Sequence, residues 1–138
     1  MLTDDFTAYA AQIELELPEP VAASAVQKKL TAFLSLIASE CSDNGAYLIG
    51  HIKCMVESDH GFYASSITAP TDAPSVRGEM TDGSTKLSIV VNVLLYGLDK
   101  VTVKQITKAA VPVALAPVTA AIKIWDLESE ENQPIHFG

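Results

Sequence analysis

The chain has 138 residues and a formal net charge of −8, with 49% hydrophobic and 19% charged residues. This composition excludes an intrinsically disordered chain, which combines few apolar groups with much charge. The excess of acids repels phosphate backbones and anionic lipid surfaces, so it argues against nucleic-acid and membrane partners. We expect one cytoplasmic domain over residues 1–138, with an acidic C-terminal tail at 126–138,.

No stretch of the sequence has the pattern of a signal peptide or the length of a membrane helix. Acidic residues follow Met1 and Leu2 directly, where a signal peptide has basic ones,. The most apolar stretch, Ala109–Ile122, is interrupted by two prolines and is shorter than the roughly 20 residues of a membrane span,. Cys41 and Cys54 are too few for a disulfide framework, so we expect two reduced, buried thiols,.

Residues 4–17 carry two competing patterns. Phe6, Ala10, Ile13 and Leu17 recur at helical spacing, whereas strict alternation of apolar and polar residues over 11–17 is typical of a strand,. Both alternatives stay open, and we favour the helix because Ala, Gln, Glu and Leu are strong helix formers.

A helix is predicted from about residue 20 to 42. Pro20 suits a first helical turn, and Asn44-Gly45 follows the expected end,. One apolar stripe runs along it at steps of three and four: Val26, Leu30, Phe33, Ile37 and Cys41,.

From residue 46 the period changes to two, which predicts strands. The expected strands are 47–57, 62–68, 75–81 and 86–96, with a turn at 59–61 and a loop at 69–74,. Asp82-Gly83 is a hairpin signal, so we expect an antiparallel meander. The near-continuous apolarity of 86–96 indicates a central strand.

A last helix is predicted over 100–111. Asp99 is its candidate N-cap, Val103, Ile106 and Ala110 face inward, and Pro112 ends or kinks it,. A short edge strand is expected at 120–127. The fold class is therefore α+β: a two-layer sandwich with an antiparallel sheet of four or five strands and helices packed on one face.

Strand alternation predicts a polar surface on the face of the sheet away from the helices. It gathers the following residues: His51, Lys53, Tyr63, Ser65, Arg77, Glu79, Ser88 and Asn92,. One interpretation is a solvated or subunit-covered surface. The other is a binding site of His51, Lys53, Tyr63, Arg77, Glu79 and Asn92. In it His51 acts as an acid or base, Lys53 and Arg77 hold an anion, and Glu79 partners one of them.

Other chemistry has weaker support in the sequence. His51 and Cys54 form an H-x-x-C pair, but on a strand residues three apart point to opposite faces, so we predict no metal site,. There is no Walker A motif, G-x-G-x-x-G or G-x-S-x-G, so we predict no cofactor and assign no catalytic residue,.

Lys100, Lys104 and Lys108 recur at intervals of four and share one helix face. They form either the solvated side of the helix or an electrostatic contact, with an acidic partner or with the acids of Asp126–Glu131.

Assembly and function follow from these features as expectations. The apolar runs Ile89–Tyr96 and Ala109–Ile122, with Ile135 and Phe137 in the tail, predict a homo-oligomer, most simply a dimer,. We predict a non-enzymatic module that binds a protein partner or a small-molecule ligand. The alternative is a small enzyme or ligand sensor that uses the His/Lys/Arg/Glu cluster, and nucleic-acid association is the weakest.

Overall fold

The computed structural model describes residues 5–115 and 120–127, which form six strands and two helices. The strands are β1 (Phe6–Val21), β2 (Leu48–Ser58), β3 (Gly61–Ile67), β4 (Ser75–Met80), β5 (Ser84–Tyr96) and β6 (Ala121–Asp126). The helices are α1 (Ala23–Asp43) and α2 (Lys100–Ala110), and a π-helical turn, Val111–Leu115, follows α2. The sheet order is β4-β3-β2-β5-β1-β6, and every neighbouring pair is antiparallel.

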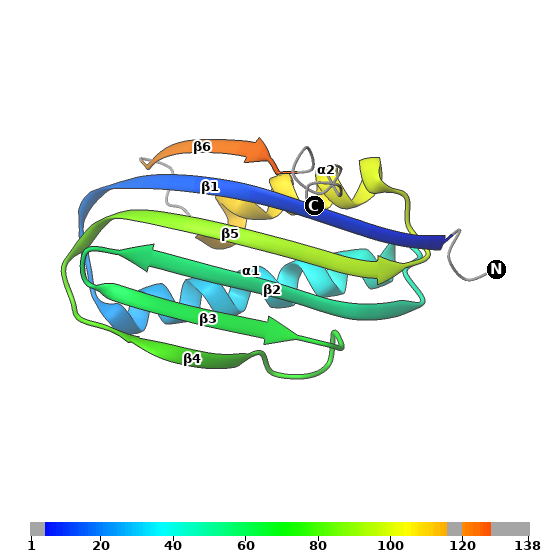
Figure 1. Ribbon diagram of the computed structural model, residues 1–138, viewed down its shortest axis with the longest axis horizontal. Helices are drawn as coiled ribbons and strands as arrows, with labels where there is room; N and C mark the ends of the chain where they lie inside the picture. The colour runs from blue at the N-terminus through cyan, green and yellow to red at the C-terminus, as the bar shows by residue number, and fades with distance from the viewer. Residues whose placement is uncertain (1–4, 116–119, 128–138) are drawn as a thin grey trace, which may run out of the picture.

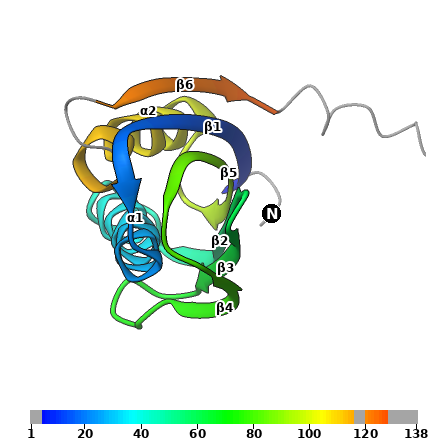
Figure 2. The same ribbon diagram turned by 90° about the vertical axis from the view of Figure 1, so that its left-hand side faces the viewer.

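The molecule has two layers. Both helices lie behind the sheet in Figure 1, and the view along the strands in Figure 2 shows them on one side of it. Helix α1 packs against β2, β3 and β4, and α2 packs against β1 and α1. The predicted two-layer α+β sandwich is therefore confirmed, with six strands where four or five were expected.

Residues 6–21 form strand β1, so the favoured helix over 4–17 was wrong; residue 4 lies outside the described residues. The alternating pattern decided the structure: Ile13 and Leu15 are buried, while Gln12 and Glu14 face the other side. Strand β1 pairs with β5 along one edge and with β6 along the other. Partners on both sides outweigh the helix propensity of single residues, which spans only about 0.7 kcal/mol.

Helix α1 confirms the predicted stripe, because the five apolar residues of that stripe are all buried. Asn44 is its C-cap, and Gly45 after it has φ +119°, as the Asn-Gly signal indicated. Pro20 lies in β1 rather than in the helix. The first helical turn is instead stabilised from a distance, since the Ala23 amide donates to the Asp82 carboxylate at 2.8 Å,.

The Asp82-Gly83 signal does not mark a hairpin. The chain leaves the edge strand β4 and next forms β5, which pairs with β2 and β1 instead of with β4. Asp82 binds the start of α1, and the Gly83 amide donates to the Val21 carbonyl at 2.8 Å. Strands β2, β3 and β4 form the expected meander, and β5 is central, as its apolarity predicted.

A bulge in β2 changes which side chains face the helices. The pairing of β2 with β5 shifts register between Ile49 and His51, where a Cβ on Gly50 would lie 3.1 Å from the Leu94 carbonyl oxygen,. Ile49 is therefore buried and Leu48 exposed, the reverse of simple alternation. Beyond the bulge the prediction is correct: Ile52, Cys54 and Val56 are buried, and Lys53 and Met55 are exposed.

The C-terminal elements agree with the sequence patterns. Asp99 caps α2 by accepting a hydrogen bond from the Thr102 amide at 2.8 Å, and α2 ends two residues before Pro112. Val103 and Ala110 are buried, and Ile106 is partly buried. Strand β6 lies at the sheet edge as expected. Among the described residues, neither helix has the length and apolarity needed to span a membrane.

A substitution on the inner side of β5 tests which of its residues face the core. Val91 has no exposed surface, while the next residue, Asn92, points to the open side. We expect Val91→Asp to abolish cooperative thermal unfolding, because an unpaired buried charge costs several kcal/mol out of a total stability of about 5–15 kcal/mol. Asn92→Asp is the matched control and is expected to unfold close to the wild type, as followed by circular dichroism. A cooperative transition at the wild-type temperature in Val91→Asp would contradict the assigned facing of β5.

Candidate functional site

The candidate site is the open face of the sheet, the face turned away from both helices. Its side chains form rows that cross the strands from β4 to β6. The central row comprises Arg77, Ala64, Met55, Val90, Gln12 and Trp125. On one side lies the acidic row, Glu79, Phe62, Glu57, Ser88, Glu14 and Lys123. On the other side lies the Lys53 row, Ser75, Ser66, Lys53, Asn92 and Ala10.

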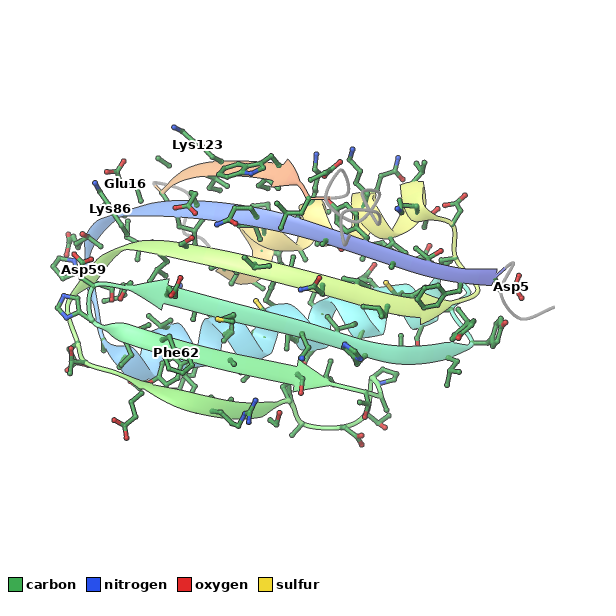
Figure 3. The ribbon with its side chains drawn as sticks, in the orientation of Figure 1. Asp5, Glu16, Asp59, Phe62, Lys86 and Lys123 are labelled. Atoms are coloured by element: carbon green, nitrogen blue, oxygen red, sulfur yellow. The ribbon has the colours of Figure 1, made fainter. Side chains whose placement is uncertain are left out.

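Three large apolar side chains are exposed on this face, two of them on the neighbouring interior strands β2 and β3 and one on the edge strand β6. Met55 is 47% exposed, Phe62 46% and Trp125 44%, and they come from three different strands. Figure 3 views the face from the front and shows Phe62 on β3, with Lys123 on β6 at the upper edge. Scattered apolar residues are ordinary on a protein surface, but a group of them on adjacent rows of one face marks an interaction surface.

A second apolar group lies at the end of the face where β1 begins. The rings of Phe6 and Tyr96 are 5.3 Å apart, and Tyr47 lies 6.4 Å from Tyr96. The Tyr47 hydroxyl donates a hydrogen bond to the Asp5 carboxylate at 2.8 Å, which raises the pKa of Tyr47. Leu48, exposed by the bulge in β2, pairs with Tyr96. This end of the open face is therefore aromatic rather than charged.

The structure brings together some of the predicted site residues. Lys53 and Asn92 are direct cross-strand partners on β2 and β5. Arg77 and Glu79 share the open side of β4, two residues apart. His51 lies on the open side of β2 opposite Leu94. Alternation alone found these five positions.

The predicted cluster does not converge on one point. From His51 to Glu79 the path crosses two strand spacings and three rows, which separates their backbones by roughly 20 Å,. Tyr63 and Ser65 were placed on the wrong face: Tyr63 is 8% exposed and Ser65 3% exposed, and both point to the helix side. Register in β3 was one residue off, and a slip of one residue moves every side chain to the other face.

Two members of a hydrogen-bonded group on the open face, Gln12 and Glu14, were missed by the sequence reasoning, whereas the third, Ser88, was predicted to lie there. The Gln12 amide donates to the Glu14 carboxylate at 2.7 Å and to the Ser88 hydroxyl at 2.8 Å. The Ser88 hydroxyl donates to the same Glu14 oxygen at 2.5 Å. The strand pattern of 11–17 was the signal that would have placed Gln12 and Glu14 here. The carboxylate of Glu14 is thus held in position by neutral donors.

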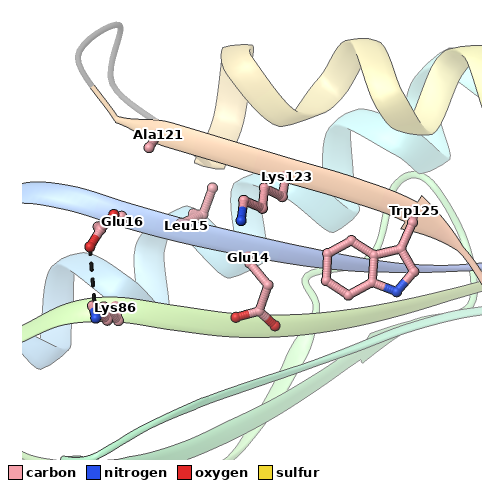
Figure 4. Close-up of a pocket in the computed structure, with 7 residues that line it drawn as sticks. All are labelled: Glu14, Leu15, Glu16, Lys86, Ala121, Lys123 and Trp125. Atoms are coloured by element: carbon pink, nitrogen blue, oxygen red, sulfur yellow. Dashed lines mark ion pairs between the residues drawn. The ribbon is translucent and has the colours of Figure 1, made fainter.

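A shallow hollow of about 290 Å³ lies where β6, β1 and β5 meet at the edge of the open face. Figure 4 shows Trp125 and Lys123 of β6 reaching over β1 beside Glu14. At one end Lys86 and Glu16 form an ion pair at 3.8 Å between two well-exposed side chains, which contributes little to stability,. The hollow thus combines an aromatic ring with balanced charge.

Two other hollows open away from the centre of the face. One of about 520 Å³ lies beside β4 and is lined by Tyr63, His60 and Glu79, next to Gly78, which has no side chain to fill it. The other, of about 340 Å³, lies between the helices and is lined mainly by apolar residues, Ile106 and Val113 among them. Neither gathers the predicted cluster of His51, Lys53, Arg77 and Glu79.

The lysines of α2 make a contact inside the chain. Lys104 pairs with the Asp126 carboxylate at 2.7 Å, and the buried Tyr9 hydroxyl donates to the other Asp126 oxygen at 2.7 Å. Burial opposes ionisation of Asp126, but hydrogen bonds from Lys104 and Tyr9 and the charges of Lys104 and Lys108 outweigh it, so the pKa of Asp126 is lowered. The expected contact with the acidic stretch is confirmed for Lys104; a contact of Lys100 or Lys108 with another protein stays a prediction.

The thiols and histidines do not assemble a reactive centre in the described part of the chain. Cys41 and Cys54 are both free and buried. Burial, with a smaller effect of the Glu40 charge, raises the pKa of Cys41 to about 11, and burial also raises the pKa of Cys54. Within residues 5–115 and 120–127, no three His, Cys, Asp or Glu side chains come close enough to hold a metal ion, and His136 lies outside these ranges.

The Asp126 contact predicts a stability difference that depends on pH. Because the pKa of Asp126 is lower in the folded state, its stabilisation is present above the unfolded pKa of about 3.9 and disappears as the pH falls through the folded value,. We expect Asp126→Asn to lower the free energy of unfolding at pH 7 by about 0.5–1 kcal/mol, with the difference closing in acid. Urea unfolding at pH 7 and at pH 3 measures this difference in the free energy of unfolding, with Asp72→Asn in the exposed 69–74 loop as control. An equal loss at pH 7 and pH 3 would exclude the ionic contact.

Thiol reactivity tests the burial of the cysteines. We expect the folded protein to react with an alkylating reagent at pH 8 far more slowly than the same protein in urea, because both thiols stay protonated and enclosed,. Mass spectrometry of intact protein counts the added groups. Rapid modification of either cysteine in the folded state would show that the core opens at that site.

Comparison with known proteins gives no family: neither a family model nor a curated protein matches the sequence. A solved structure of a Zn(II)-bound triple mutant of the YjiA GTPase has a TM-score of 0.40 and 15% identity, covering 80% of this chain and 30% of its own. A hydantoinase/carbamoylase family amidase from Burkholderia ambifaria has a TM-score of 0.41 and 6% identity, covering 88% of this chain and 27% of its own. The chain spans less than a third of either protein, and likenesses this distant do not indicate a shared activity.

Proposed function

We propose that this chain is a non-enzymatic, cytoplasmic binding module whose open face binds the surface of another protein. The observation that carries this is the exposure of Met55, Phe62 and Trp125 on adjacent rows of one face. Covering the exposed half of each side chain is worth about 1 kcal/mol. Met55 and Phe62 lie on interior strands and Trp125 lies on the edge strand β6, with charged residues around them. An apolar group with charged residues around it resembles the apolar core and polar rim of a protein interface.

The shape of the face favours a protein over a small molecule. Ligand pockets are concave and direct a few polar groups at one point. Here the apolar groups are spread over β2, β3 and β6, and the hollow at the β6 edge has balanced charge. The cysteines are free and buried, which agrees with a reducing compartment,.

The enzyme alternative has less support. An acid–base pair needs its members within hydrogen-bond reach of the same substrate atom. His51 and Glu79 are separated by strands and rows, and Tyr63 faces the helices. The side chains of the predicted cluster therefore have no common point of action.

The solvent accessibility of position 53 tests whether another protein covers the open face in an extract of the cells that make this chain. Lys53 is exposed next to the central row, and Lys28 is exposed on α1, on the helix side. We expect the thiol of Lys53→Cys to be alkylated several-fold more slowly than that of Lys28→Cys in an undiluted extract of cells that naturally make the protein. In dilute purified protein the two are expected to react alike. The buried native thiols supply the background.

Equal labelling of the two introduced thiols in the extract would contradict the proposed function, since it would leave the face bare where partners are present. Protection of both thiols would indicate crowding rather than a specific surface and would also count against it.

A further inference from the structure

Resting on the proposed function, we infer that the surface held by the open face is that of a second copy of this chain, stacked face to face about a two-fold axis. The axis runs across the strands along the central row. Each strand then lies over its own copy in the reversed direction.

The order of charges along β2 carries this inference. On its open side β2 presents His51, Lys53, Met55 and Glu57 in succession, so a base and an acid flank an apolar residue at equal distance. A two-fold axis through Met55 places Lys53 of one copy over Glu57 of the other, and symmetry makes this contact twice. The strands of two packed sheets cross at about 30°. One row away from the axis, this angle displaces a side chain sideways by less than the distance between neighbouring strands.

The other rows agree with the same axis. The acidic row holds three carboxylates and one lysine, whereas the Lys53 row holds one base and no acid. Reversal of the strands places these two rows against each other, so that Glu57 meets Lys53 while Glu14 and Glu79 meet the uncharged Ala10 and Ser75. No carboxylate then faces another carboxylate, and the one facing charge pair sets the orientation of the interface. The central row meets itself, which brings Met55, Val90 and Trp125 against apolar copies of themselves.

The remaining charges are accommodated. Glu14 already accepts hydrogen bonds from Gln12 and Ser88, so its carboxylate stays paired when water leaves the face,. Arg77 meets its own copy at the edge strand β4, where water remains and Glu79 of each copy lies one row away.

The area of the face suits a stable pair. Strands about 4.8 Å apart that rise about 3.3 Å per residue give the paired positions of the six strands an area of roughly 850 Å²,. Standard protein interfaces bury about 800 Å² on each partner. A full-face contact therefore reaches the size at which specific dimers form.

A charge exchange on β2 tests the arrangement. The cross-strand neighbours of Lys53 are Ser66 and Asn92, and those of Glu57 are Phe62 and Ser88, so reversal of either charge breaks no ion pair between paired strands. We expect Lys53→Glu and Glu57→Lys each to weaken dimerisation of the purified chain about tenfold, because each variant opposes like charges twice. The double variant is expected to return to within about threefold of the wild type. Sedimentation equilibrium measures the dissociation constants, circular dichroism verifies folding, and Lys28→Glu on α1 is the control.

The tryptophan provides a second readout. Trp125 is the one tryptophan of the chain and lies on the central row. Its emission is expected to shift to shorter wavelength as the wild-type protein is concentrated, and to do so only at higher concentration in each single variant. A dimer whose Trp125 emission does not move would use another surface and would overturn the inference.

The outcomes separate this inference from the proposed function. A purified chain that stays monomeric, together with protection of Lys53→Cys in cell extract, would overturn the second copy as occupant and leave the binding module standing. A monomer with no protection in extract would overturn both. A double variant weaker than either single variant would overturn the two-fold axis, because the exchange restores opposite charges only about that axis.

Discussion

The structure depends on the pairing of β5 with both β2 and β1. The chain reaches β5 from the edge strand β4, yet β5 lies at the centre of the sheet. Its inner side supplies five buried apolar residues to the core, Leu87, Ile89, Val91, Val93 and Leu95. Because β5 joins the meander β2-β3-β4 to the outer pair β1-β6, loss of this strand would leave two small sheets, neither with a complete core.

The connections around β5 are stabilised by contacts between distant parts of the sequence. Asp82 and Gly83, in the segment before β5, bind the start of α1 and the end of β1. At the opposite edge, Asp126 of β6 binds Lys104 of α2 and the buried Tyr9 hydroxyl of β1. These contacts attach the edge elements to the helical layer. Both helices therefore cover the same side, and the other side of the sheet is left open with Met55, Phe62 and Trp125 on it.

The candidate site shows which side chains strand alternation can assign to the correct face of the sheet. The period of two placed His51, Lys53, Arg77, Glu79 and Asn92 on the open face, because each lies in a strand whose register the apolar residues define,. It failed in β3, where Phe62 and Tyr63 are adjacent aromatic residues and hydrophobicity does not distinguish which one points inward. The pairing of Tyr63 with Val56, an inward residue of β2, decides it.

The sequence by itself determined the α+β class, the course of α1 and α2, most strand positions and the burial of both cysteines. These features depend on periodicity and capping within one segment, so they are present in local sequence. Only the tertiary structure decided that residues 6–21 are a strand, that β5 crosses to the centre, and that Phe62 rather than Tyr63 lies on the open face. Strand pairing joins residues as far apart as Phe6 and Tyr96, and the free energy of such contacts exceeds the small preferences of single residues,.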